Sequence, residues 1–247
     1  MEEKINALMI RGVDYKDNDK MLTLYSLEKG KVGAGIKGVK KAGAKLTFCA
    51  MPFCFAEYVL NVKGDKYSVI GATEIESFYK LRLKVQSFYA ASAVAEFLLK
   101  FTEEDEVNEE LFYSAVNAFK SMCFDEQPPE ISLIKFWAGA LKSIGYGAEF
   151  FYCGKCGKTE ISSRAFFDFS AGKFVCENCA VKNAAEIMPS TLNAVRYCLT
   201  CDGDFPKDEK TLPEKSDFLR ALKFLNHYTL LKLGERLNSV SEYVKLV

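Results

Sequence analysis

Four cysteines in two close pairs near the middle of the chain are the residues whose spacing most directly predicts chemistry. Cys153 and Cys156 form the first pair, Cys176 and Cys179 form the second, and nineteen residues separate the pairs. Two such pairs at this separation can close around one tetrahedral metal ion. Four thiolates complete the shell of a zinc ion and leave no position for water, so the spacing predicts structural rather than catalytic Zn²⁺. The alternative is four independent buried thiols.

The residues around the pairs favour a small metal-binding module. Gly154 and Gly157 suit the tight turn of the first pair, because glycine accepts positive φ without a steric penalty. Between the pairs, residues 164–169 and 173–175 flank a short turn and predict a β-hairpin. We therefore expect a zinc ribbon at residues 151–182, inserted into a helical domain.

The chain has nine cysteines, an odd number that a secreted disulfide scaffold would not favour. Cys198 and Cys201 form a third pair near the end of a predicted helix, where they are either redox-active, metal-binding or two buried helical thiols. Cys49, Cys54 and Cys123 lie among apolar residues and are predicted to belong to the core.

A second candidate for chemistry is a basic stretch at residues 29–45, which contains six lysines, five glycines and no acidic residue. Such a segment can follow a phosphodiester backbone, and its glycines allow close approach of the main chain. An ordinary solvated lysine loop would have the same composition. Gly33, Gly35 and Gly38 also spell a dinucleotide-binding fingerprint, but no helix is predicted after them, as that motif requires.

The elements that must position these residues change in character along the chain. Five β-like runs come first, followed by helical periodicity, which indicates an α+β chain with a small five-stranded barrel of OB or SH3-like type. The runs cover residues 5–13, 21–27, 31–37, 49–62 and 66–73. The predicted divisions are a barrel domain at 1–78, a helical domain at 79–150 and 183–247, and the zinc module at 151–182.

Helical periodicity begins after residue 76, with apolar positions recurring on one face of each predicted helix. Pro128 and Pro129 start a third helix that should end at Gly145. Ser190 is a predicted N-cap, and Ser216 or Asp217 is expected to cap the last helix. The acidic stretch at 103–110 is predicted to be a solvated helix start.

Charge and hydropathy restrict the class of protein. The net charge is zero, but residues 1–64 hold eleven basic and seven acidic residues, a local balance of +4. Neither a signal peptide nor a membrane span is predicted, so we expect a cytoplasmic protein with no membrane partner. An enzyme is not favoured: the one histidine, His227, lies in a predicted helix and is expected to be structural.

The order of these features resembles the RecO family of recombination mediators. The resemblance rests on the run from Leu22 to Lys31, on Ile36–Lys41, on Pro52-Phe53, and on two segments of the second half, Leu141–Tyr146 and Phe167–Gly172. It implies an OB-fold DNA-binding barrel, a helical domain and a four-cysteine zinc ribbon insertion.

The resemblance also implies a bacterial, nucleoid-associated protein with a function in DNA repair and homologous recombination that is mechanical and not enzymatic. Such a protein binds single- and double-stranded DNA, anneals complementary strands, engages the C-terminal tail of single-strand binding protein and helps RecR load RecA. An adaptor that uses the zinc ribbon for protein contacts alone is the alternative. The family's basic loop corresponds to Lys37, Lys40 and Lys41, with Arg11 and Lys45 as further DNA-binding candidates.

Overall fold

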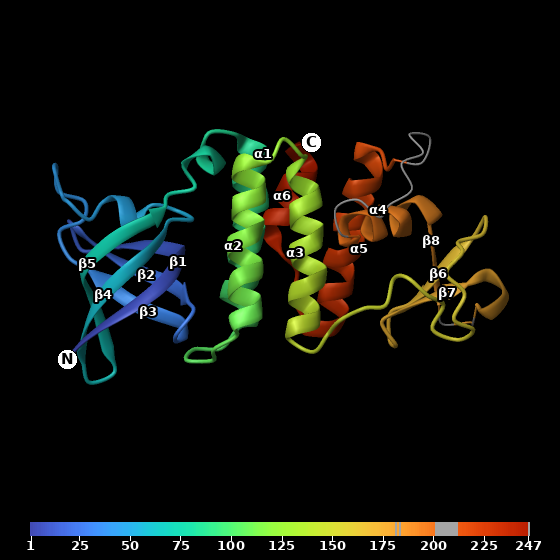
Figure 1. The fold of residues 1–247 in the computed structure, drawn as a ribbon, viewed down its shortest axis with the longest axis horizontal. Coiled ribbons are helices and arrows are strands. Elements are labelled where there is room, and N and C mark those ends of the chain that lie inside the picture. Colours follow the sequence, from blue (N-terminus) through green and yellow to red (C-terminus); the bar gives the residue numbers. More distant parts are fainter. Residues whose placement is uncertain (181, 183, 201–211, 247) are drawn as a thin grey trace. The chain divides into compact units, whose positions relative to one another are not determined.

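The computed structural model describes residues 1–180, 182, 184–200 and 212–246. The chain forms two compact units, Met1–Gln127 and Pro128–Val247 (Figure 1). The first unit contains a β-barrel and two helices, and the second contains a helical bundle with a small sheet. Together they confirm the predicted α+β class. The finer division at 1–78, 79–150 with 183–247, and 151–182 stays a prediction.

Five strands close the barrel of the first unit in the order β1-β2-β3-β5-β4, with β4 pairing back to β1. Neighbouring strands are antiparallel except β3 and β5, which are parallel. This closure removes the sheet edges and is of the OB type, as expected from the sequence. The strands are β1 (Glu2–Tyr15), β2 (Asp19–Ser26), β3 (Gly30–Ile36), β4 (Phe55–Lys63) and β5 (Lys66–Glu76).

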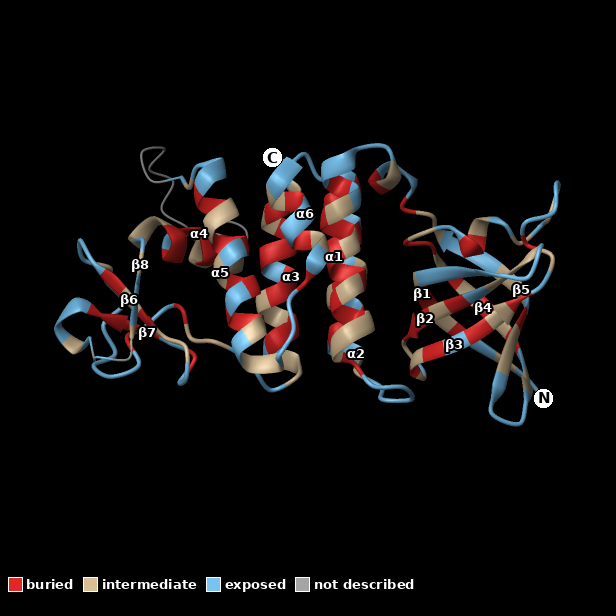
Figure 2. Cartoon of the chain, turned by 180° about the vertical axis from the view of Figure 1, so that it is seen from behind, coloured by how far each residue is buried: buried red, intermediate tan, exposed pale blue. Residues whose placement is uncertain are grey.

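The interior of the barrel is filled by side chains that alternate along the strands. In β3, Val32, Ala34 and Ile36 are buried, whereas Gly33 between them is exposed. Figure 2 shows the same alternation of buried and exposed residues on the barrel strands. Each fully buried aliphatic side chain contributes roughly 1.5–3 kcal/mol. The period of two seen in the sequence therefore corresponds to one face in the core and one in solvent.

One predicted strand is shorter than expected. The run at residues 49–62 was predicted to be continuous, but Phe48–Ala50 forms a 3-10 helix, η1, and β4 begins only at Phe55. Pro52 has no N–H for a strand ladder, and Phe53 has φ of 70°, which turns the chain. Cys49 and Cys54 are nevertheless fully buried, as predicted for core residues.

Aromatic side chains join the barrel to helices α1 (Val85–Phe101) and α2 (Glu109–Phe124). The ring of Phe53 lies 5.5 Å from that of Phe88 on α1 and 5.3 Å from that of Phe119 on α2, measured between centroids. A short 3-10 helix, η2 (Tyr79–Arg82), leads into α1, and Arg82 donates a hydrogen bond to the carbonyl of Pro52. The left-handed backbone conformation of Phe53 thus places its ring between the two helices.

The acidic stretch after α1 is a loop for most of its length and not a helix start. It runs beside the barrel, where Glu104 forms bridges with Gly30 and Lys31, and α2 begins only at Glu109 behind the N-cap Asn108. The Lys31 ammonium donates to the carbonyls of Leu99 and Thr102 at the end of α1. The sequence pattern alone could not show this long-range pairing.

The second unit packs helices on one another through buried apolar faces. Its helices are α3 (Pro129–Ser143), α4 (Pro189–Leu199), α5 (Lys215–Leu233) and α6 (Asn238–Leu246). Trp137 on α3 is fully buried and donates a 3.0 Å hydrogen bond to the Thr229 hydroxyl on α5. Gly145, with φ of 86°, follows the end of α3 as predicted. No helix within the described ranges is long and apolar enough to cross a membrane.

Two predicted helix caps are wrong. Helix α4 already begins at Pro189, so Ser190 lies inside its first turn. Helix α5 begins at Lys215, and its cap is Glu214, whose side chain accepts from the backbone of Asp217 while Asp217 accepts from that of Glu214. This capping box satisfies two N–H groups at once, which neither Ser216 nor Asp217 achieves as a cap alone. Helix α6 was not predicted.

Candidate metal centre and candidate nucleic-acid interface

The two cysteine pairs meet at the edge of a three-stranded sheet. The sheet has the order β7-β6-β8, formed by β6 (Ala165–Asp168), β7 (Lys173–Cys176) and β8 (Ala185–Ile187), and β8 was not predicted. Cys176 ends β7, and Cys179 lies in the 3-10 helix η3 (Glu177–Cys179) that follows. Cys153 and Cys156 lie on a tight turn in which the Gly157 N–H donates to the carbonyl of Cys153. The predicted hairpin is thus present.

All four sulfur atoms lie within 4.8 Å of one another, and those of Cys156 and Cys176 are 3.6 Å apart. Zn–S bonds of ~2.3 Å in a tetrahedron place sulfur atoms ~3.8 Å apart. A disulfide requires ~2.05 Å, and all four thiols are free. The donor set and its spacing therefore fit a zinc ion. When bound, zinc would cross-link the turn at Cys153 to the end of β7.

The protein surroundings favour the thiolate form at Cys153 but raise the pKa of Cys176 and Cys179. Burial opposes ionisation of Cys153, but backbone N–H groups of Cys176, Cys156 and Lys155 lower the pKa of its thiol to about 6. The Cys176 N–H donates to the Cys153 sulfur at 3.4 Å. Hydrogen bonds with Cys156 and Cys176 raise the pKa of Cys179 to about 12, because a second thiolate is disfavoured beside the first. A dication removes this repulsion.

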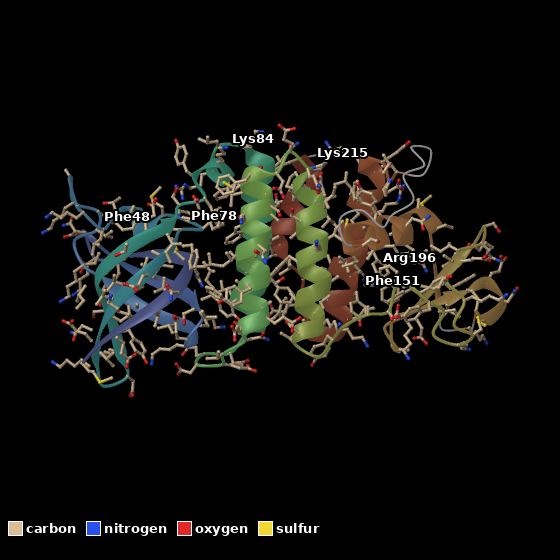
Figure 3. All side chains as sticks on the ribbon, in the orientation of Figure 1. Phe48, Phe78, Lys84, Phe151, Arg196 and Lys215 are labelled. Carbon is tan, nitrogen blue, oxygen red and sulfur yellow. The ribbon has the colours of Figure 1, made fainter. Side chains whose placement is uncertain are left out.

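Arg196 on α4 fixes the irregular segment that carries the first cysteine pair, and sequence reasoning missed it. Its guanidinium donates to the carbonyls of Phe150, Phe151 and Thr159 at 2.7–2.8 Å, and Figure 3 labels Arg196 and Phe151. The guanidinium also lies 5.2 Å from the ring centroid of Phe174. An isolated arginine in a helix gives no signal of this role, since its acceptors are backbone carbonyls more than thirty residues away.

An aromatic cluster connects the metal-binding sheet to α5. The Phe167 ring lies 5.9 Å from that of Phe150 and 4.9 Å from that of Phe224 on α5. Tyr228, also on α5, contacts Phe167 and donates to the carbonyl of Tyr146. Aromatic pairs of this kind contribute about 0.5–1.5 kcal/mol each beyond burial. The sheet is therefore supported by protein contacts as well as by its cysteine cluster.

The other cysteines differ in environment. Cys198 on α4 is buried, and burial raises the pKa of its thiol to about 12, which favours the buried-thiol interpretation. Its predicted partner Cys201 lies outside the described residues. Cys123 on α2 is buried, as expected. The single histidine, His227, packs against the edge of the Phe169 ring on an exposed face of α5.

The basic segment after β3 folds into consecutive turns at residues 37–47, here named the cationic loop. The Gly38 N–H donates to the Asp19 carboxylate at 2.8 Å, and the Lys40 N–H donates to the carbonyl of Asn18. Buried Val39 anchors the loop in the barrel core. The Thr47 hydroxyl bonds to the carbonyl of Val39, which closes the loop on itself. The loop therefore presents its lysines from a tied backbone.

The structure places the predicted DNA-binding residues at different degrees of availability. Lys37, Lys41 and Lys45 are exposed, and none of the three forms an ion pair within the part of the chain that the structure describes. Lys40 differs, because its ammonium lies 2.7 Å from the Asp14 carboxylate on β1. Arg11 is exposed on β1 opposite Thr23, away from the cationic loop in sequence. Nothing in the sequence pattern signalled the pair with Asp14.

Gly33 leaves the middle of the outer face of β3 open, whereas Gly30 at the start of the strand is covered by the backbone of Glu106. A side chain at Gly33 would meet no atom within 4 Å. This face belongs to the strands through which OB folds bind oligonucleotides. Gly33, Gly35 and Gly38 do not form a dinucleotide site, because β3 pairs with β2 in an antiparallel ladder and leads into turns, not into a helix.

Comparison with known proteins agrees with this architecture. The model for the family "Recombination protein O N terminal" matches residues 1–79, and that for "Recombination protein O C terminal" matches residues 82–241.

Three relatives are each named DNA repair protein RecO. The protein from Clostridium novyi is 30% identical over 194 residues, covering 78% of this chain and 75% of its own. That from Caldicellulosiruptor bescii is 28% identical over 184 residues, covering 74% and 75%. That from Thermoanaerobacter sp. is 28% identical over 204 residues, covering 81% of each. With both halves matched in order, the chain belongs to the RecO family of DNA repair and recombination proteins.

Proposed function

We propose that the chain acts as a recombination mediator that binds single- and double-stranded DNA through the cationic loop and anneals complementary strands. In this proposal it engages the tail of single-strand binding protein and helps RecR load RecA onto the coated strand. The cationic loop carries the proposal: it holds Lys37, Lys40, Lys41 and Lys45 beside the open outer face of β3 on an OB-type barrel. Lysines attract phosphates independently of sequence, which suits a mediator that works on any strand.

The work of such a protein is mechanical and not catalytic. Annealing requires that two strands be held without reading their bases, and a cationic surface neutralises the repulsion between their phosphates. We propose a structural role for Zn²⁺ at Cys153, Cys156, Cys176 and Cys179, because four thiolates leave no open position on the metal. The metal would stabilise the sheet and would not activate water.

The proposal is tested by anisotropy of a labelled strand with matched charge removal. The Lys37→Gln/Lys41→Gln variant removes two exposed ammonium groups from the cationic loop, and Lys63→Gln/Lys66→Gln removes two exposed groups from the β4–β5 turn. The loop variant should weaken binding alike for all base sequences. Its slope of log affinity against log salt should fall by about 1.4 for single strands and about 1.8 for duplexes. Equal weakening by both variants would refute the assignment to the loop.

The same assay separates the mediator from an adaptor that uses only the zinc ribbon. The wild-type protein should retain single strands at ~50 mM salt, where counterion release favours binding. Absence of retention at this salt concentration would leave the adaptor as the better account.

A further inference from the structure

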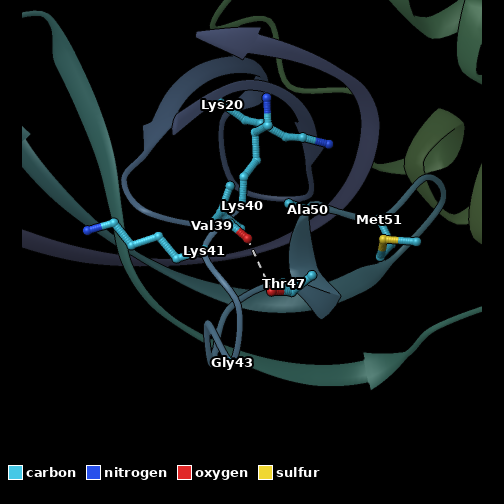
Figure 4. A pocket seen from close by; sticks show the side chains of 8 residues that line it. All are labelled: Lys20, Val39, Lys40, Lys41, Gly43, Thr47, Ala50 and Met51. Carbon is cyan, nitrogen blue, oxygen red and sulfur yellow. Dashed lines mark hydrogen bonds between the residues drawn. The ribbon is translucent and has the colours of Figure 1, made fainter. Parts of the chain in front are cut away.

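A cleft of about 370 Å³ lies between the cationic loop and β2. Figure 4 shows Lys20, Lys40 and Lys41 around it, with Met51 on the opposite side from Lys41. Its lining residues are Lys20, Val39, Lys40, Lys41, Gly43, Thr47, Ala50 and Met51, three of them cationic and none acidic. Lys20 was not among the residues singled out from the sequence, because it lies in the preceding strand. The fold brings it to the loop.

Asp14 does not line the cleft itself, but its carboxylate pairs with two of the lysines that do. Its carboxylate lies 2.7 Å from the Lys40 ammonium and 3.9 Å from that of Lys20. It is paired with Lys20 across the β1–β2 ladder, so its position is set by strand register. Hydrogen bonding from Lys40 lowers the pKa of Asp14, which keeps it ionised at neutral pH. Asp14 thus holds an anionic oxygen where a bound phosphate oxygen would contact the same two ammonium groups.

The pair is exposed and can exchange partners. Asp14 has 61% and Lys40 34% of its side-chain surface accessible. Surface ion pairs contribute little to stability, so a phosphate can displace the carboxylate readily. In contrast, the backbone around Lys40 is tied to the β1–β2 turn through the carbonyl of Asn18 and the carboxylate of Asp19. The backbone of Lys40 therefore stays beside the cleft when its flexible side chain changes partner.

Resting on the proposed function, we propose that this cleft binds one backbone phosphate of a nucleic-acid strand through Lys20 and Lys40, and that Asp14 is a built-in competitor for it. Lys41 points away from the other two lysines in Figure 4 and serves an adjacent phosphate. The competitor halves the net positive charge of the Lys20, Lys40 and Asp14 group. It limits how tightly a strand is held, which a protein that must release annealed DNA requires.

The test compares Asp14→Asn with Asp17→Asn in the anisotropy assay on a labelled single strand. Both changes remove one negative charge from the same hairpin, but Asp17 forms no ion pair among the described residues. Asp14→Asn should bind about threefold more tightly at ~50 mM salt. Its salt slope should steepen by about 0.7, so that its advantage over wild type shrinks about 2.6-fold between 50 and 200 mM. Asp17→Asn should show less than half of either effect.

A double-mutant cycle with Lys40→Gln separates competition from a structural role. If Asp14 acts through Lys40, then Asp14→Asn loses most of its effect in the Lys40→Gln background. Lys20→Gln alone should weaken binding, and all variants should keep the wild-type circular dichroism. Equal affinities of Asp14→Asn and wild type, with wild-type binding intact, would overturn this inference and leave the proposed function standing. Absence of wild-type binding would instead refute the proposed function.

Free phosphate presents the same chemistry as a strand, so a competition arm is included. Orthophosphate and chloride are compared as competitors at matched ionic strength. If the two ions displace the labelled strand equally, the cleft is assigned to the phosphates of the polymer. Millimolar binding of orthophosphate that is lost in Lys20→Gln but leaves the labelled strand bound would overturn the assignment to nucleic acid.

Discussion

Gly30 ends the turn between β2 and β3 with φ of 64°, and the segment after α1 passes directly over it. Replacing Gly30 by alanine adds one methyl group at this crossing. The new carbon would lie 2.6 Å from the carbonyl carbon of Glu106 and closer still to its oxygen. Because the neighbour is backbone, no side chain can rotate away, and the whole segment must shift.

Two costs add at this position. A left-handed conformation costs about 1–2 kcal/mol for an alanine. Moving the Glu106 segment to van der Waals distance requires about 1 Å, and overpacking of this kind costs about 1–3 kcal/mol. Gly30→Ala should therefore destabilise the first unit by about 2–5 kcal/mol. Gly43→Ala is the matched control, because Gly43 has φ of 73° and no atom within 4 Å of the added carbon. It should cost only about 1–2 kcal/mol.

Hydrogen exchange of the β2 and β3 amides measures the free energy of opening in each variant. The single tryptophan, Trp137, lies in α3, so its fluorescence during urea unfolding follows the second unit separately. The hydrogen-exchange protection of the β2 and β3 amides should fall by more in Gly30→Ala than in Gly43→Ala. Equal losses in the two variants would refute the reasoning, because they would show that the Glu106 segment imposes no constraint on Gly30.

Two further predictions concern the second unit. Cys176→Ser should lower zinc affinity by more than about 100-fold, whereas the control Cys123→Ser should keep the wild-type zinc content. Elemental analysis after dialysis measures the zinc content of each variant. Stoichiometric zinc in Cys176→Ser would contradict the metal site. Although burial opposes it, hydrogen bonds from Ser190, the Glu214 backbone and Arg220 lower the pKa of Asp217. Its contribution as the N3 partner of the capping box, about 1 kcal/mol, is present above the ordinary carboxyl pKa of 3.8 and is lost as pH falls through the lower folded value. Urea unfolding followed by Trp137 fluorescence measures the free energy of unfolding of wild type and Asp217→Asn. The difference between these two free energies should shrink below about pH 4. A difference that stays constant with pH would be inconsistent with this linkage.

Local patterns in the sequence predicted the elements that depend on local chemistry. The two cysteine pairs converge because each CxxC turn fixes two thiols and the hairpin between them returns the chain. The five strands follow the alternation of apolar residues, and Gly145 ends α3 as a residue with positive φ should. Such signals reside in a few neighbouring residues and survive in any tertiary context.

Features that depend on distant partners could not be predicted in the same way. Arg196 binds backbone carbonyls of an irregular segment far away in sequence, and Asp14 neutralises Lys40 only because the fold brings β1 to the cationic loop. The expected strand through Cys49 failed at Pro52 and Phe53, where packing of the Phe53 ring between two helices overrides β propensity. The short strand β8 has too few residues for a periodic signal.

Annealing of complementary strands coated with single-strand binding protein tests the central claim most directly. The wild-type protein and the Lys63→Gln/Lys66→Gln control should anneal such strands at similar rates, and Lys37→Gln/Lys41→Gln should be markedly slower at low salt, with the deficit shrinking as salt rises. Annealing at the wild-type rate by the loop variant would contradict the account, because the cationic loop of the barrel could then not be the surface that holds the strands.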